Sequence, residues 1–211
     1  MEEKPEWWAS PAVVGLMGFG TTTMLAGLAN LPLPYGGGFS NNATVYGMAM
    51  AFGGTAQFAA GLIALRKGNM FAGSAFVGYG SFWWAFTLML LWYNAGGSAV
   101  TLYGLAGFAF IWMMFTLSFM INAPKHGWGI TGVFVLLWIA FILLTVKFYS
   151  LAGSDASGCS GLATVGCGPF AANAAANWAV GGEIILTGLL AWYVATADLT
   201  NWNYGRKLLP A

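Results

Sequence analysis

Polar side chains inside apolar segments are the residues of this sequence most able to do chemistry. They are Thr55, Gln57, Tyr79, Ser81 and Glu183. Lipid offers no partners for their hydrogen bonds, so such groups are expected to face protein or a water-filled path. The pattern therefore predicts a polar route, or polar contacts between helices, inside an otherwise apolar bundle.

Glu183 differs from the other acidic residues because it lies near the middle of an apolar segment, AVGGEIILTG. A carboxyl group at that depth costs a few kcal/mol unless it is protonated, paired or hydrated. Two interpretations are open. Glu183 is either a site for a proton or substrate, or a protonated group that forms a hydrogen bond across a helix or subunit interface.

The two cysteines lie close together in a Gly- and Ser-rich segment, SLAGSDASGCSGLATVGCGPFAAN. A disulfide between Cys159 and Cys167 is plausible, because the intervening residues are flexible and this segment is expected on the oxidising side of the membrane. No histidine or further cysteine lies nearby, and His126 is expected on the other face. Neither a metal site nor a cofactor is therefore expected.

The composition is that of a membrane protein. Of the 211 residues, 59% are hydrophobic and 6% are charged, whereas a soluble domain carries about 25% charged residues. This balance predicts a multi-pass protein of the plasma membrane. The net charge of +1 provides no electrostatic footprint for nucleic acid. The expected partners are the lipid bilayer, copies of the same chain and small solutes.

Six apolar segments are long enough to span a bilayer, which takes about 20 residues per helix. The predicted helices cover residues 11–30, 44–65, 71–93, 100–121, 130–148 and 174–195, in a single all-α domain over residues 1–211. Nearly all Lys and Arg residues fall on one face, so the positive-inside rule predicts that both termini are cytoplasmic. Lys147, near the outer end of the fifth helix, is the exception. No Lys or Arg is predicted at mid-membrane.

Several motifs resemble one family of transporters. The segment SPAVVGLMGFG, Ser10–Gly20, is similar to the Asn-Pro-Ala-Pro-Leu-Gly-Leu signature, followed by Gly-Phe, of the succinate–acetate permease or acetate uptake transporter family. FGGTAQ at Phe52–Gln57, KGNMF at Lys67–Phe71 and YGSFW at Tyr79–Trp83 follow the family pattern in order and spacing. Ser10 replaces the Asn of the signature, and Val13 replaces its second Pro.

The resemblance implies six helices per subunit, a homohexamer, and a path through each subunit for acetate and similar small monocarboxylates, sometimes with succinate. The family path narrows at an aromatic and aliphatic constriction. By motif position, its residues are Phe19, Tyr79 and Leu137. Whether protons accompany the substrate in a carrier, or the anion passes through a channel, is left open by the sequence.

The candidate substrate-binding residues are hydroxyl, amide and carboxyl groups, namely Ser10, Thr22, Thr55, Gln57, Ser81 and Glu183. An intramembrane enzyme would need paired acids, an activated nucleophile or histidine ligands at membrane depth, and the predicted helices offer none of these. A tetraspan-like scaffold or regulator fits the composition but leaves the polar residues unexplained. The sequence therefore favours a transporter over both alternatives.

Overall fold

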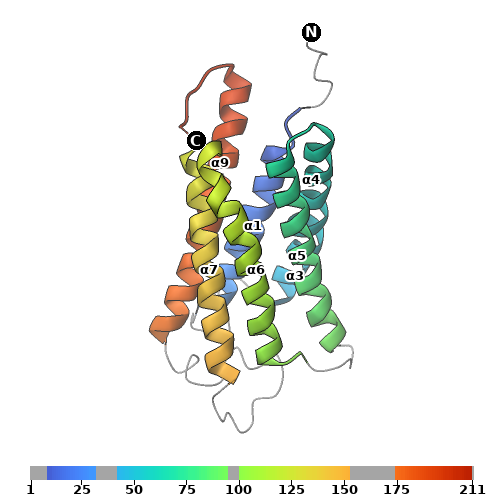
Figure 1. Ribbon diagram of the computed structural model, residues 1–211, viewed down its shortest axis with the longest axis vertical. Coiled ribbons are helices and arrows are strands. Elements are labelled where there is room, and N and C mark those ends of the chain that lie inside the picture. Colours follow the sequence, from blue (N-terminus) through green and yellow to red (C-terminus); the bar gives the residue numbers. More distant parts are fainter. Residues whose placement is uncertain (1–8, 32–41, 95–99, 153–173, 211) are drawn as a thin grey trace.

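A computed structural model describes residues 9–31, 42–94, 100–152 and 174–210 of the chain. Over these ranges the chain forms a bundle of helices (Figure 1). The predicted all-α class is therefore confirmed. The plausible disulfide between Cys159 and Cys167 lies outside the described residues.

Each predicted span overlaps helical structure. The long helices are α1 (Ala12–Asn30), α5 (Met70–Asn94), α6 (Leu102–Asn122), α7 (Trp128–Ala152) and α9 (Ala174–Tyr204). Among the described residues, five helical stretches are long and apolar enough to cross a membrane: Ala12–Asn30, Ala43–Arg66, Leu102–His126, Trp128–Ala152 and Ala175–Tyr204. The remaining long helix, α5, is not one of these five stretches and is 25 residues long. The main difference from expectation is α9, which continues well past residue 195.

The second span is a helix with a change of pitch. It consists of α3 (Asn42–Met48), the π-helical segment η1 (Ala49–Ala56) and α4 (Gln57–Arg66). The Thr55 hydroxyl donates to the Met50 carbonyl at 2.7 Å, five residues back, which matches the wider π turn. Such segments are frequently found at functional sites. Here the wider turn contains the Gly-Gly pair of the FGGTAQ motif.

The turn between α4 and α5 is built from residues suited to it. Gly68 has a φ of 81°, a conformation that residues with a Cβ rarely adopt. The Asn69 side chain then accepts a hydrogen bond from the Ala72 N–H at 3.0 Å, which caps the start of α5. This basic turn therefore closes a tight antiparallel helix pair.

Glycines let the backbones of α1 and α9 touch. A Cβ on Gly20 would lie 2.8 Å from the Gly188 carbonyl oxygen, and a Cβ on Gly27 would lie 2.9 Å from the Gly181 carbonyl oxygen. Both distances are shorter than van der Waals contact. Helix association in lipid depends on such close packing of small residues, so these glycines fix the position of α1 against α9.

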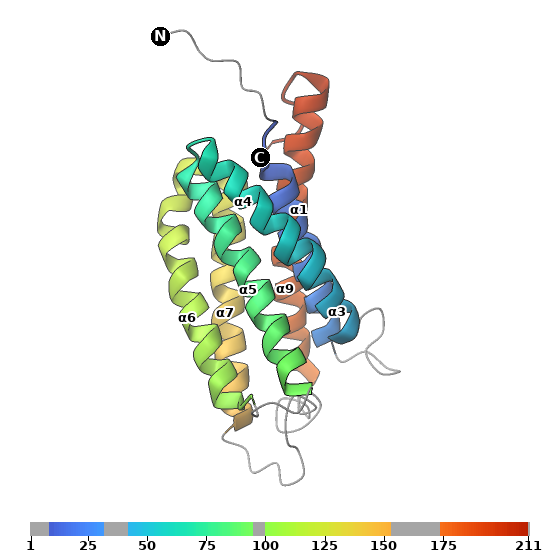
Figure 2. The same ribbon diagram turned by 90° about the vertical axis from the view of Figure 1, so that its right-hand side faces the viewer.

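Basic residues gather at one end of the bundle. Figure 2 shows the start of α1, the end of α9 and the turn between α4 and α5 at this end. Lys67 lies in that turn, Lys125 lies in the short helix η2 (Ala123–His126), and Arg206 follows α9. Lys147 lies toward the opposite end, in the last turns of α7.

Replacing Gly188 with Ala should destabilise the bundle, because the new Cβ would lie 2.6 Å from the Gly20 carbonyl oxygen. Overpacking of this kind costs roughly 1–3 kcal/mol. Thermal unfolding of the purified protein in detergent measures the loss. Gly182→Ala is the matched control, because nothing lies within 4 Å of its Cβ position and both variants gain the same helix propensity. Equal melting temperatures for the two variants would contradict the packing argument.

Candidate functional site

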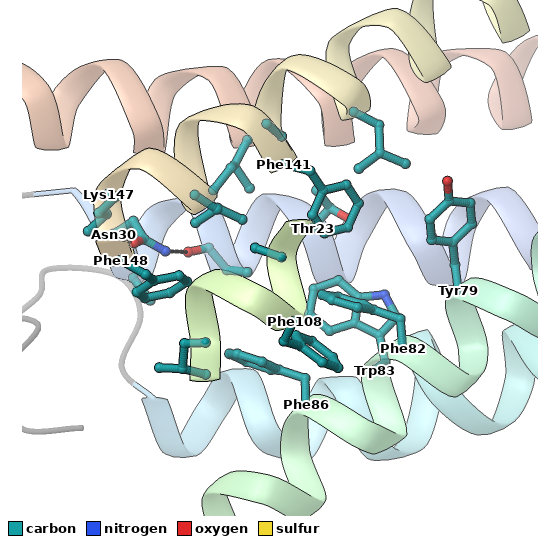
Figure 3. A pocket seen from close by; sticks show the side chains of 18 of the residues that line it. Thr23, Asn30, Tyr79, Phe82, Trp83, Phe86, Phe108, Phe141, Lys147 and Phe148 are labelled. Atoms are coloured by element: carbon teal, nitrogen blue, oxygen red, sulfur yellow. Dashed lines mark hydrogen bonds between the residues drawn. The ribbon is translucent and has the colours of Figure 1, made fainter. Parts of the chain in front are cut away.

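Two cavities enter the bundle from opposite ends. The first, which we name the Lys147 cavity, is lined by residues that include Thr23, Asn30, Trp83, Phe141 and Lys147 (Figure 3). The second, which we name the His126 cavity, is lined by residues that include Leu16, Gln57, Asn69, His126 and Asp198. Both are mainly apolar, with a few polar groups.

Three residues line both cavities, and they are Phe19, Tyr79 and Leu137. Each is almost fully buried, at 5%, 3% and 5% exposure respectively. The rings of Phe19 and Tyr79 contact each other with their centroids 5.6 Å apart. These side chains therefore lie where the two cavities meet, and we name this group the neck. Motif position alone selected these same three residues, and their role in a constriction remains a prediction.

The Tyr79 ring is held in place from α6. Its hydroxyl lies 2.8 Å from the Thr116 hydroxyl, which in turn donates to the Trp112 carbonyl at 2.7 Å. Because a threonine hydroxyl carries one proton, Tyr79 is the donor to Thr116. The ring also packs edge-on against Phe115 with the centroids 5.3 Å apart. Tyr79 is thus held in a fixed position. Its hydroxyl, the one polar side-chain atom of the neck, is hydrogen-bonded to Thr116.

Several buried polar groups have no hydrogen-bond partner in the described part of the chain. They include the hydroxyls of Thr22 and Thr87, both polar atoms of the Gln57 amide, and the Trp83 indole N–H. Of these, Trp83 lines the Lys147 cavity and Gln57 the His126 cavity. Gly53 of η1 lies among them, because its Cβ position is 2.7 Å from the Thr22 hydroxyl and 2.9 Å from Trp83 Cδ1. An unpaired buried polar group costs about 1–3 kcal/mol. These groups are therefore suited to bind water or a polar ligand.

The two cavities differ in charge. Among the described residues, Lys147 is the single charged residue that lines its cavity, whereas the His126 cavity contains Asp198 and no Lys or Arg. Lys147 is 1% exposed, and its ammonium group donates to the Asn30 side-chain oxygen at 2.9 Å. Sequence reasoning placed Lys147 near a helix end but missed its burial. The signal was a lone cation in an apolar helix, which by default marks a functional site.

Five predicted binding residues line neither cavity: Ser10, Thr22, Thr55, Ser81 and Glu183. Ser10 is exposed and accepts a hydrogen bond from the Ala12 N–H at 3.3 Å. Thr55 is exposed and accepts a hydrogen bond from the Trp84 indole at 3.3 Å. Ser81 donates to the Val77 carbonyl of its own helix at 2.8 Å. Of the candidates, the structure therefore brings only Gln57 to a cavity wall. Thr22 is buried against Gly53 and not in a cavity wall.

Glu183 lies away from the neck, half-buried on α9. One of its carboxyl oxygens accepts a hydrogen bond from the Thr187 hydroxyl at 2.9 Å. The other oxygen is buried and has no partner among the described residues. The hydrogen bond to Thr187 lies within α9 and crosses no helix interface, so both interpretations of Glu183 stay predictions.

Replacing Glu183 with Gln should leave stability almost unchanged, because an amide oxygen can still accept from Thr187. Glu183→Leu removes that acceptor from the fully buried Thr187 hydroxyl, and should destabilise by roughly 1–3 kcal/mol. Thermal unfolding of the two variants in parallel measures the difference. A loss in Gln as large as in Leu would show instead that the ionised carboxylate is needed.

The sequence of the chain is similar to those of known membrane transporters. The sequence profile of the GPR1/FUN34/yaaH family matches residues 2–205. The chain is 32% identical to the succinate-acetate/proton symporter SatP of Escherichia coli K12, over 96% of this chain and 94% of the relative. It is 34% identical to an uncharacterised protein of Methanothermobacter thermautotrophicus, over 96% of this chain and 90% of the relative.

A solved structure shares the fold. It is that of the bacterial acetate channel SatP, which has a TM-score of 0.79 and 32% identity to this chain. The alignment covers 96% of this chain and 98% of that chain. The similarity therefore extends over the whole bundle rather than over a few motifs.

Proposed function

Since the chain belongs to the GPR1/FUN34/yaaH family, we propose that it transports acetate and similar small monocarboxylates across the plasma membrane, with succinate as a further candidate. One observation carries the proposal beyond family membership. Two cavities approach each other from opposite ends of the bundle, and the same three side chains line both. The named SatP relatives are a symporter and a channel, so the scaffold alternative is not favoured.

The lining suits a solute with one charged end and one methyl group. The apolar neck of Phe19, Tyr79 and Leu137 accepts a methyl group but offers a doubly charged or bulky solute little compensation for lost water. Thr22 and Gln57 lie buried beside it with unpaired polar atoms, which can take over hydrogen bonds from the hydration shell. Selection would therefore combine narrowness with a small number of polar contacts.

Orientation and assembly complete the proposal. The basic end of the bundle, with Lys67, Lys125 and Arg206, should face the cytoplasm by the positive-inside rule. The Lys147 cavity then opens to the outside and the His126 cavity to the cytoplasm. The homohexamer in the lipid bilayer, implied by the sequence resemblance, stays a prediction.

Coupling to protons is a separate question, because the relatives are described both as a proton symporter and as a channel. Among the described residues, the neck contains no carboxyl or imidazole group that could carry a proton. Glu183 lies outside both cavities. An uptake–pH profile that becomes flat in Glu183→Gln would identify Glu183 as the coupling site despite its position.

Proteoliposomes containing the purified protein test the function directly. Acetate should enter them faster than it enters protein-free vesicles, and acetamide, which has the same shape without the charge, measures leakage. An acetate-driven current without a pH gradient is expected of a channel, whereas electroneutral uptake that needs the gradient is expected of a symporter with one proton per anion. Acetate flux equal to that of empty vesicles would refute the proposal.

Replacing Phe19 with Ala should relax selection by size, because it removes a ring from the neck that separates the cavities. Butyrate uptake should rise relative to acetate uptake in proteoliposomes. Phe86→Ala is the matched control, because Phe86 lines the Lys147 cavity but not the neck. An unchanged butyrate-to-acetate ratio in a well-expressed Phe19→Ala protein would remove Phe19 from the path.

A further inference from the structure

Among the described residues, Lys147 is a buried cation with no anion paired to it. Its side chain is 1% exposed, and no carboxylate in the described part of the chain lies within ion-pair distance. The neutral side-chain oxygen of Asn30, 2.9 Å away, is its hydrogen-bond partner there. A buried ammonium group is costly unless it is paired. This cation therefore lies in a setting that an added anion would stabilise.

The Asn30 side chain is itself oriented. Its amide nitrogen donates to the Ala26 carbonyl at 2.9 Å, which turns its oxygen toward Lys147. The ammonium group carries three donors. One is used by Asn30, and the described residues give no partner for the other two. Figure 3 shows Lys147 and Asn30 together at one end of the cavity lining, with Tyr79 of the neck at the other end. The cation is thus held on the wall along which a solute would approach the neck.

The surroundings limit the class of ligand. Phe82, Phe141 and Phe148 are among the apolar residues that line the same cavity, and Lys147 is its one charged residue among those described. A cation on an apolar wall fits a carboxylate with a short hydrocarbon tail better than inorganic phosphate, which would leave several oxygens without partners. The His126 cavity, which contains Asp198, offers a carboxylate no comparable attraction.

We propose that Lys147, positioned by Asn30, forms a binding site for small monocarboxylates in the Lys147 cavity, which the anion occupies before it reaches the neck. The inference rests on the proposed function for the identity of its ligand. It adds a specific cationic site, on one side of the neck, to a path whose other described lining residues include no Lys or Arg. The competing explanation is that the Lys147–Asn30 bond is only a clamp between α7 and α1.

Direct binding separates these explanations without relying on transport. A ligand that binds the folded protein raises its melting temperature, so sodium acetate should raise that of the purified full-length protein more than sodium chloride at equal ionic strength. Acetamide should give no comparable rise. In Lys147→Met the acetate effect should fall, and in Lys147→Arg, which keeps the charge, most of it should remain. Lys125→Met removes an exposed lysine outside both cavities and is the matched control.

Uptake kinetics give the second measurement. In proteoliposomes, Lys147→Met should raise the apparent KM for acetate about tenfold, equivalent to about 1.4 kcal/mol, with a smaller effect on the maximal rate. Lys125→Met should match the wild-type protein. An unchanged KM together with an unchanged acetate-dependent melting shift would overturn the site, even if Lys147→Met melts earlier, because a clamp would produce that result.

Asn30→Asp keeps the proposal testable if Lys147→Met does not fold. This variant gives Lys147 a carboxylate partner of its own in place of the Asn30 oxygen, so the helix contact stays while the added acid competes with acetate. The acetate-dependent melting shift should decrease and the KM should rise. Wild-type values for both would overturn the site. Wild-type protein that binds acetate through Lys147 but shows no flux would refute the proposed function and leave the site in place.

Discussion

Backbone contact between α1 and α9 sets the position of the helix that contributes residues at every level of the path. Without a Cβ at Gly20 and Gly188, the two backbones approach to a distance that side chains would prevent. Helix α1 then carries Phe19 into the neck and Asn30 to the Lys147 cavity. Because lipid provides no hydrophobic drive for helix association, this van der Waals contact is what stabilises the arrangement. A larger separation between α1 and α9 would displace Phe19 and Asn30 together, because both lie on α1.

Helix α5 supplies the opposite wall by the same means. A Cβ on Gly61 of α4 would lie 3.0 Å from the Gly73 carbonyl oxygen, and one on Gly80 would lie 3.0 Å from the Gly54 carbonyl oxygen. These contacts bind α5 to the second span, and Tyr79 lies next to one of them. Its hydrogen bond to Thr116 of α6 then fixes the ring. Phe19 and Tyr79 of the neck therefore lie on helices whose backbones are held by glycine contacts.

The buried polar groups near the neck are of two kinds, those with a hydrogen-bond partner and those without one among the described residues. The Tyr79 hydroxyl, inside the neck, has a fixed protein partner, whereas Thr22, Gln57 and Trp83 have polar atoms without a partner among the described residues. In the proposed path, a neck hydroxyl that already donates to protein does not hold a passing anion. Unpaired groups beside it can replace lost water. Such a path favours brief contacts, with Lys147 as the strongest attraction at one end.

Hydropathy by itself determined the helices, because a spanning helix must satisfy its own backbone and needs about 20 apolar residues to do so. Motif resemblance also identified Phe19, Tyr79 and Leu137, which the structure brings together at the junction of the cavities. The direction in which each polar side chain points could not be predicted from the sequence. The π turn of η1 changes the helical phase, and Thr55 is exposed beside a buried Gln57. The burial of Lys147 was decided only by the tertiary structure, because its partner Asn30 belongs to a different helix and lies 117 residues away in the chain.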